Sequence, residues 1–331
     1  MAGDALWITE AEVVQLMDLG EAITSLETAL REEARGEAQN MAKTLLQYGK
    51  NNLHAIGARL GNLVGTKTWT HTQGGTCPLL LLWSAEDGSL AAVIEAFALG
   101  NMRTGGISGV AAKWMAREDA AVMAIAGAGK QALAQVGTML AVRNIRRLQI
   151  YSPRAESRDA FAAAVAEQFG IETAGCASME EACRGAHIVT LVTRAAQPFL
   201  EARMLERGAH LNAVGAIAPD REEFAQDVFG RATLVAVDYV PGVQQLSREF
   251  MTRYAASWDA VKPLSALIAS GRKRGAQDDV SLFKAMGMGI SDLALGTELL
   301  KRARGQGAGR TIPQPKKTKP RLAPARAKTA A

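Results

Sequence analysis

A glycine-rich segment that follows a short apolar run carries the clearest chemical signal in the sequence. The run at 122–126 (VMAIA) leads into the segment 127–132 (GAGKQA), and a helical pattern follows at 131–142. In such a segment the first glycine permits a tight turn, and the second lets the backbone approach a pyrophosphate. Free N–H groups at the start of the helix then bind the phosphates. We predict a dinucleotide site at this loop, formed by Gly127, Ala128, Gly129, Lys130 and Gln131.

The end of the next predicted strand bears on which dinucleotide binds. It reads Tyr151-Ser152-Pro153-Arg154. NAD sites commonly have an acidic residue at this point, whereas Ser152 can hydrogen-bond to a 2′-phosphate and Arg154 can pair with one. We therefore favour NADP(H), and NAD(H) stays possible. The alternative is that Arg154 is an ordinary solvated surface charge.

The cysteines and histidines predict no metal centre. The three cysteines form neither an even framework nor a metal-type pair, and the four histidines show no zinc spacing. We expect reduced, mostly buried thiols and no metal ion. The residues concerned are Cys77, Cys176, Cys183, His54, His71, His187 and His210.

The elements that must position these residues are indicated by the pattern of apolar residues along the sequence. Residues 8–35 and 91–117 have apolar residues at helical spacing, and residues 40–90 have short apolar runs separated by turn residues. From residue 120 strands alternate with helices, which is typical of a parallel sheet covered by helices on both faces. After Pro241 the pattern is helical through residues 282–304. We predict an α/β protein with a Rossmann-type doubly wound sheet.

Composition and charge limit the classes of function. The chain of 331 residues is long enough for two domains. It has no apolar run of membrane-spanning length and no secretory signal, so we expect a cytoplasmic protein without membrane partners. Residues 306–331 carry seven basic residues and no acid, and without them the net charge of +5 becomes about −2. We expect no nucleic-acid binding by the body of the protein.

The segment 306–331 is rich in Pro, Lys and Ala, so we expect a disordered basic tail. Two roles are open for it: a solvated extension, or a segment that engages acidic partners.

Three further segments resemble the ornithine cyclodeaminase/mu-crystallin family. They are 102–112 (MRTGGISGVAA), 208–215 (GAHLNAVG) and 282–287 (LFKAMG), in addition to the glycine loop. The resemblance covers roughly residues 10–305. It implies a Rossmann domain inserted into an α+β substrate and dimerisation domain, and a homodimer. We place the substrate domain at 1–115, the NAD(P)-binding domain at 116–275 and a returning C-terminal helix at 276–305.

The resemblance also assigns roles to side chains outside the glycine loop. Arg103 matches a clamp for the α-carboxylate of an amino or imino acid, which suits its planar fork. Lys67 matches an active-site lysine, whose pKa a nearby cation would lower, so that it can relay a proton. Lys43 lies near a second carboxylate-binding position. The resemblance implies further cofactor contacts by Thr104, Thr193, Val214 and Arg221.

One position departs from the family pattern. The cyclodeaminases carry a catalytic aspartate in the loop where this chain has Ile217, and the next acid is Asp220. An isoleucine can neither accept a proton nor orient a cation. We therefore expect little or no ornithine cyclodeamination, and a more apolar substrate pocket.

The predicted function is an NAD(P)H-dependent oxidoreductase that acts on the C–N bond of a small amino or imino acid. It would reduce a ketimine or cyclic imine, or run the reverse amino-acid dehydrogenation. Two alternatives are an ornithine cyclodeaminase-type cyclase and a non-catalytic mu-crystallin-like protein that binds NADPH, because fold does not fix function.

Overall fold

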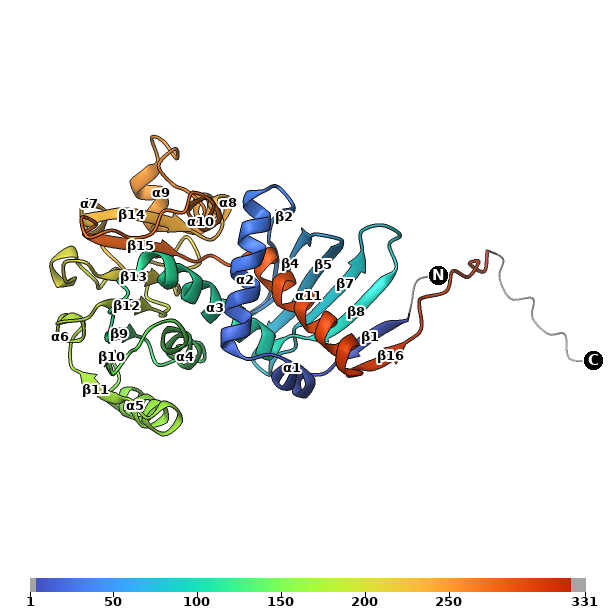
Figure 1. Cartoon of the computed structure of the whole chain (residues 1–331), viewed down its shortest axis with the longest axis horizontal. Coiled ribbons are helices and arrows are strands. Elements are labelled where there is room, and N and C mark those ends of the chain that lie inside the picture. The colour runs from blue at the N-terminus through green and yellow to red at the C-terminus, as the bar shows by residue number, and fades with distance from the viewer. Residues whose placement is uncertain (1–3, 323–331) are drawn as a thin grey trace, which may run out of the picture.

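The computed structural model describes residues 4–322, which form two sheets joined by a long helix. Figure 1 shows the two sheets side by side, with helices α2, α3 and α11 in the region where they meet. The helices of this region are α1 (Glu10–Leu16), α2 (Leu19–Ala34), α3 (Phe97–Met115) and α11 (Gly289–Gln306).

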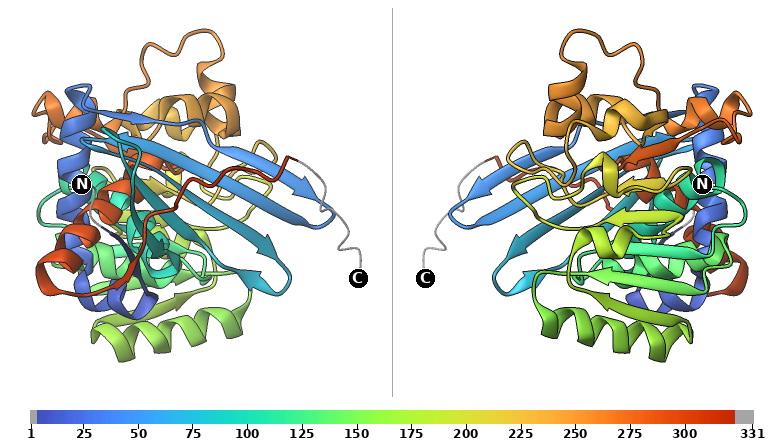
Figure 2. Two further views of the ribbon diagram at one scale, coloured as in Figure 1. Left: turned by 90° about the vertical axis from the view of Figure 1, so that its right-hand side faces the viewer. Right: turned by 90° about the vertical axis from the view of Figure 1, so that its left-hand side faces the viewer.

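The first sheet has nine strands in the order β16-β1-β8-β7-β5-β4-β2, with β3 paired to β4 and β6 paired to β5. Its pairings are antiparallel except for β1 with β8. In the two views of Figure 2, the ends of the blue and teal strands extend beyond the helices. The strands are β1 (Ala5–Ile8), β2 (Ala38–Asn40), β3 (Thr44–Tyr48), β4 (Asn51–Leu60), β5 (Leu63–Thr72), β6 (Gly75–Thr76), β7 (Leu79–Ser84), β8 (Leu90–Glu95) and β16 (Arg310–Ile312).

The second sheet has seven parallel strands in the order β11-β10-β9-β12-β13-β15-β14. The chain starts at β9, adds β10 and β11 on one side, and then crosses to β12 on the other. The order therefore reverses between β9 and β12, where ligands bind in doubly wound folds. The strands are β9 (Val122–Ala126), β10 (Arg147–Tyr151), β11 (Glu172–Cys176), β12 (Ile188–Leu191), β13 (His210–Ala213), β14 (Ala232–Val237) and β15 (Val280–Lys284).

Two apolar cores cover the faces of this parallel sheet, and a third fills the first domain and extends onto β14, β15 and α10 (Leu264–Ala269). The prediction of a doubly wound α/β fold is thus confirmed. The remaining helices are α4 (Ala132–Val142), α5 (Ala155–Phe169), α6 (Met179–Cys183), a 3-10 turn (Ala202–Met204), α7 (Val228–Arg231), α8 (Val240–Leu246), α9 (Arg248–Tyr254) and α10 (Leu264–Ala269).

Helix α3 brings the two domains together through two glycines. A Cβ at Gly105 would lie 2.6 Å from Oγ1 of Thr138, and one at Gly109 would lie 2.4 Å from Cγ2 of the same threonine. Only glycine permits this close packing of α3 on α4. The glycines of the 102–112 segment therefore hold the helix that carries Arg103 against the helix that follows the glycine loop.

Three sequence predictions need correction. Residues 8–35 form two helices, because Thr9 and Asp18 each begin a helix with a capping box. Residues 280–284 form the buried strand β15, so the return to the first domain begins after Lys284, not at residue 276.

The third correction concerns the predicted disordered tail. Residues 310–312 form β16, which pairs with β1 at the edge of the first sheet. The side chain of Gln314 exchanges hydrogen bonds with the backbone of Leu90. Residues 323–331 of the predicted tail lie outside the described residues. None of the helices described is long and apolar enough to cross a bilayer.

Candidate active site

A cleft of about 1230 Å³ lies where the strand order reverses. Ligand pockets usually measure about 300–1,000 Å³, so this cleft has room for more than one small molecule. Its walls come from both domains, and most of the predicted site residues line it: Lys43, Arg103, Thr104, Gly127, Gly129, Lys130, Gln131, Ser152, Arg154, Thr193, Val214 and Ile217.

The glycine loop forms one wall of the cleft. Gly127 has φ +107°, and a Cβ there would lie 2.7 Å from the carbonyl oxygen of Val192. A Cβ at Gly129 would meet nothing within 4 Å, so this part of the loop faces open space. Ala132 is fully buried at the first residue of α4. The loop therefore fits a dinucleotide pyrophosphate, as predicted from the residue types. Ala128 belongs to the loop but does not line the cleft.

Two exposed cations line the cleft, Arg154 after β10 and Lys130 in the glycine loop. No carboxylate within residues 4–322 pairs with either of them. Ser152 is buried beside Arg154. Arg158 is committed elsewhere, because its Nη1 donates a hydrogen bond to the carbonyl oxygen of Ser152 at 2.9 Å. The cleft thus offers free positive charge to an anionic group.

The loops after β12 and β13 form the opposite part of the cleft. Thr193 and Val214 line it, at the ends of adjacent strands. Arg221 does not line it: its Nη1 donates to the carbonyl oxygen of Arg194 at 2.7 Å, and Arg194 lines the cleft. The structure thus places Arg221 as a support for the loop rather than at the cleft surface. Thr104 lines the cleft from α3, with its hydroxyl bonded to the carbonyl oxygen of Gly100.

Lys67, Arg103 and Asp292 meet at the domain boundary. Nζ of Lys67, on β5, lies 2.5 Å from Oδ1 of Asp292, on α11, and Nε of Arg103, on α3, lies 3.3 Å from the same oxygen. Asp292 is 0% exposed and Lys67 is 3% exposed. Lys67 lies beneath the cleft surface, whereas Arg103 lines the cleft. The Nη groups of Arg103 form no hydrogen bond with the described residues, so they are free to donate hydrogen bonds to a carboxylate.

The charges around Lys67 tune its proton affinity. Burial and the adjacent Arg103 guanidinium lower the pKa of Lys67 to about 8, while the Asp292 carboxylate opposes them. An ammonium group whose pKa lies near the working pH can both give and take a proton. The structure therefore agrees with the sequence prediction on two points: the pKa of Lys67 is lowered, and a cation, Arg103, lies next to it.

Lys43 and Ile217 complete the surface around Arg103. Burial, followed by the charge of Arg103, lowers the pKa of Lys43. No acid within residues 4–322 forms an ion pair with Lys43. Ile217 is 42% exposed and lines the cleft. Asp220, the nearest acid in sequence, pairs with Arg221 and does not line the cleft. Asp220 thus does not take the place of the missing aspartate.

Sequence reasoning missed three buried acids at this site: Asp238, Glu223 and Asp292. Asp238 lines the cleft and accepts hydrogen bonds from the backbone of Met286 and Gly287. Burial raises the pKa values of Asp238 and Glu223. The available signal for Asp292 was a single acid among apolar residues in the first turn of a helix.

The remaining candidates have structural roles or none at this site. Nδ1 of His187 accepts a hydrogen bond from the backbone of Ala121 at 3.0 Å. Cys176 and Cys183 are buried free thiols and Cys77 is exposed. Within residues 4–322, no group of three or more His, Cys, Asp and Glu side chains is arranged to hold a metal ion.

Fold and site together define a dinucleotide-dependent oxidoreductase of the Rossmann type, in which Arg103 lines the cleft. The profile of the ornithine cyclodeaminase/mu-crystallin family matches residues 4–307. The chain belongs to this family, which confirms the resemblance predicted from its sequence.

One relative and two solved structures are similar to this chain over most of its length. Alanine dehydrogenase of Archaeoglobus fulgidus is 30% identical over 324 residues, 93% of this chain and 98% of that one. The structure of Thermococcus litoralis Delta(1)-pyrroline-2-carboxylate reductase with NADH and L-proline is 25% identical, with TM-score 0.86. The match covers 93% of this chain and 100% of that one. An archaeal alanine dehydrogenase dimer with bound NAD is 27% identical, with TM-score 0.86. The match covers 94% of this chain and 99% of that one.

Proposed function

We propose that this protein is an NAD(P)H-dependent reductase of small cyclic or acyclic 2-imino acids, which also runs the reverse oxidation of the amino acid. One observation carries the proposal: a lysine with a pKa of about 8 and an arginine with a free fork share one buried carboxylate beside a dinucleotide cleft. The relatives named above act on substrates of this kind.

The cofactor would lie along the cleft, where the open space at Gly129 and the start of α4 suit its pyrophosphate. When bound in reduced form, it supplies the hydride that a C=N carbon needs to become an amine carbon. Residues of the chain then handle the carboxylate and the proton. The Nη groups of Arg103 would bind the α-carboxylate, with Lys43 adding positive charge nearby.

Lys67 would control the proton on the substrate nitrogen. In the reducing direction its ammonium gives a proton to the imine nitrogen or keeps that nitrogen protonated, and in the oxidising direction its neutral amine removes a proton. Asp292 keeps the lysine in place and stabilises its charged form. Ile217, Ile56, Ile107 and Trp69 give the pocket apolar walls, which suit an imine with a small or apolar side chain.

A substrate and cofactor panel tests this proposal. We expect NADPH-dependent loss of absorbance with Δ1-pyrroline-2-carboxylate or with 2-oxo acids plus ammonia. We expect the reverse reaction with L-amino acids at alkaline pH. Absence of turnover with both NADPH and NADH would refute the enzyme proposal. Formation of proline and ammonia from ornithine at a comparable rate would refute the role assigned to Ile217.

Our proposed cofactor preference is NADP(H), with NAD(H) as the weaker alternative. Arg154 and the buried Ser152 line the cleft after β10, where a 2′-phosphate would lie, and Lys130 lines it from the glycine loop. No acid within residues 4–322 forms an ion pair with either cation. The NAD and NADH bound to the two solved relatives support a nicotinamide cofactor in general. Comparison of kcat/KM for NADPH and NADH decides between them.

We also propose a homodimer, for which an exposed apolar surface on β3 and β4 gives support. Every residue of β3 is exposed, and Leu45 and Leu46 are each 60% exposed. A second copy of the chain is the occupant that we infer, since the similar archaeal alanine dehydrogenase is a dimer. Light scattering should give twice the mass of the chain, and Leu45→Arg should lower it. We place the enzyme in the cytoplasm.

A second candidate function is binding of a reduced dinucleotide without turnover. Two observations favour it: Lys67 lies below the cleft surface, and Ile217 replaces an acid. The substrate panel separates the two candidates, because a binding protein would enhance the fluorescence of NADPH without oxidising it.

A further inference from the structure

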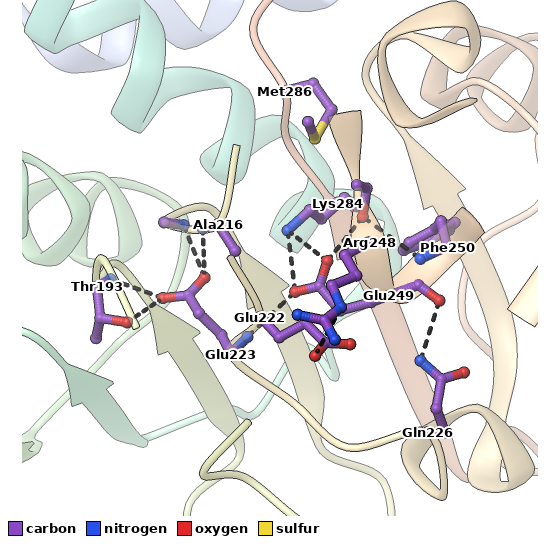
Figure 3. A network of polar contacts seen from close by, with 12 residues as sticks. Thr193, Ala216, Glu222, Glu223, Gln226, Arg248, Glu249, Phe250, Lys284 and Met286 are labelled. Carbon is purple, nitrogen blue, oxygen red and sulfur yellow. Dashed lines mark hydrogen bonds and ion pairs between the residues drawn. The ribbon is translucent and has the colours of Figure 1, made fainter. Parts of the chain in front are cut away.

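The buried carboxylate of Glu223 joins the two loops that follow β12 and β13. Its Oε1 accepts hydrogen bonds from the backbone N–H and the hydroxyl of Thr193, at 2.6 and 2.8 Å. Its Oε2 accepts from the backbone N–H groups of Gly215 and Ala216, at 2.8 and 3.0 Å. Figure 3 shows the carboxylate between Thr193 on one side and Ala216 on the other. Each oxygen thus holds one loop.

Direct contact between the same loops leaves no room for a side chain. A Cβ at Gly215 would lie 2.1 Å from the carbonyl oxygen of Thr193 and 2.4 Å from Oε1 of Glu223. Thr193, Gly215 and Ile217 all line the cleft. The spacing of these loops therefore sets the shape of the cleft wall opposite the glycine loop.

Two further buried charged groups lie next to Glu223. Its backbone N–H donates to Oε1 of Glu249, on α9, at 3.2 Å, and Nζ of Lys284, on β15, lies 3.4 Å from Oε2 of Glu249. All three side chains are 0% exposed. The four groups that meet Glu223 are N–H and O–H donors, so its carboxylate is suited to the ionised form, which only accepts. The charge of Lys284 favours that form by opposing the effect of burial on the pKa of Glu223.

We propose that Glu223 is a positioning residue for the dinucleotide: by binding both loops, it fixes the wall on which the nicotinamide end of the cofactor rests. This inference rests on the proposed function, since it requires a dinucleotide in the cleft. Glu223 does not itself line the cleft. It acts through Thr193 and the 214–217 segment.

Glu249 offers a matched control for the experiment. Glu223→Gln keeps the side-chain shape, but its amide NH₂ points at N–H donors, so at least one loop loses its acceptor. Glu249→Gln removes a carboxylate from the same buried network without touching Thr193 or Gly215. The binding constants of NADPH and NADH are measured by fluorescence, and amide hydrogen exchange is followed in the free proteins.

We expect Glu223→Gln to weaken dinucleotide binding about tenfold, which is the effect of one lost buried hydrogen bond. We also expect faster amide exchange in residues 192–197 and 214–218. Glu249→Gln should leave both readouts within about twofold of the parent protein, although both variants lose thermal stability.

Equal dinucleotide affinities in the two glutamine variants, or unchanged exchange in both loops, would overturn the inference. If Glu223→Gln fails to fold, Glu223→Asp keeps the charge and is too short to hold both loops, so parent-like affinity in that variant would also overturn it. A parent protein that binds dinucleotide but reduces no imine refutes the proposed catalysis and leaves this test intact. A parent protein that binds no dinucleotide refutes both.

Discussion

Replacement of Asp292 by asparagine tests how the buried carboxylate controls Lys67. The variant keeps an oxygen at 2.5 Å for the lysine but removes the negative charge. Burial and Arg103 already lower the pKa of Lys67 to about 8 against the opposing effect of Asp292. Loss of an opposite charge in contact displaces a pKa by about 1 to 3 pH units. The pKa of Lys67 should therefore fall further in the variant.

The size of the effect follows from the protonated fraction of Lys67. At pH 8 roughly half of the lysines are protonated in the parent, and after a displacement of about two pH units roughly one in a hundred is. Imine reduction at pH 8 should thus slow about 50-fold, which corresponds to about 2.3 kcal/mol. The KM for the imino acid should change little, because Arg103 and Lys43 stay in place.

The assay is the pH profile of kcat for imine reduction. In the parent, activity should fall above a midpoint near pH 8, and in Asp292→Asn this midpoint should move to lower pH. Glu298→Gln, on the same helix at a half-buried residue that pairs with Lys301 and Arg302, is the control and should leave the midpoint in place. An unchanged midpoint in Asp292→Asn, or an equal loss of rate at every pH, would refute this account of Lys67.

Three further predictions concern the cofactor, the core and the chain end. Arg154→Ala should raise the KM for NADPH about tenfold or more and leave that for NADH within twofold; an equal effect on both would contradict the assignment of a 2′-phosphate site. Burial lowers the pKa of His210 from 6.5 to about 3. Between these two pH values the imidazole is protonated in the unfolded chain but neutral in the folded protein. Stability should therefore be intact above pH 6.5 and fall as the pH drops, by up to about 1.4 kcal/mol per pH unit. Urea unfolding at pH 7 and pH 5 measures this loss, which His210→Gln should reduce. Truncation after Gln306 removes β16 and the Gln314 contact, and should cost about 2 kcal/mol of stability. Truncation after Leu322 keeps β16 and the Gln314 contact, so equal melting temperatures for the two truncations would show that β16 contributes no stability.

The parts of the fold that were predictable carry local signals. The glycine loop stands between a clean strand and a clean helix, and the alternation after residue 120 predicts the parallel sheet directly. By contrast, β15 is a short apolar run, which periodicity alone cannot distinguish from a buried helix. Strand β16 pairs through its backbone, so its side chains give no pattern that marks it as a strand.

The candidate site was predictable where residue type limits chemistry. A planar guanidinium suits a carboxylate, and the family resemblance assigned that role to Arg103 and the proton relay to Lys67. Asp292 was not predictable, because its partner Lys67 lies 225 residues earlier in the chain. Glu223 belongs to an acidic stretch, Asp220 to Glu223, in which only burial distinguishes the residue that binds both loops.

The position of Asp292 on the last helix has a consequence for how the protein is made. Strand β15 completes the dinucleotide-binding sheet at Lys284, whereas α11 begins only at Gly289 and contains the counter-charge of Lys67. Domains fold in the order in which they leave the ribosome. A growing chain can thus complete its cofactor-binding sheet while Lys67 still has no carboxylate beside it. Release of the final helix therefore supplies the carboxylate partner of Lys67, the lysine to which we assign the proton transfer in the proposed function.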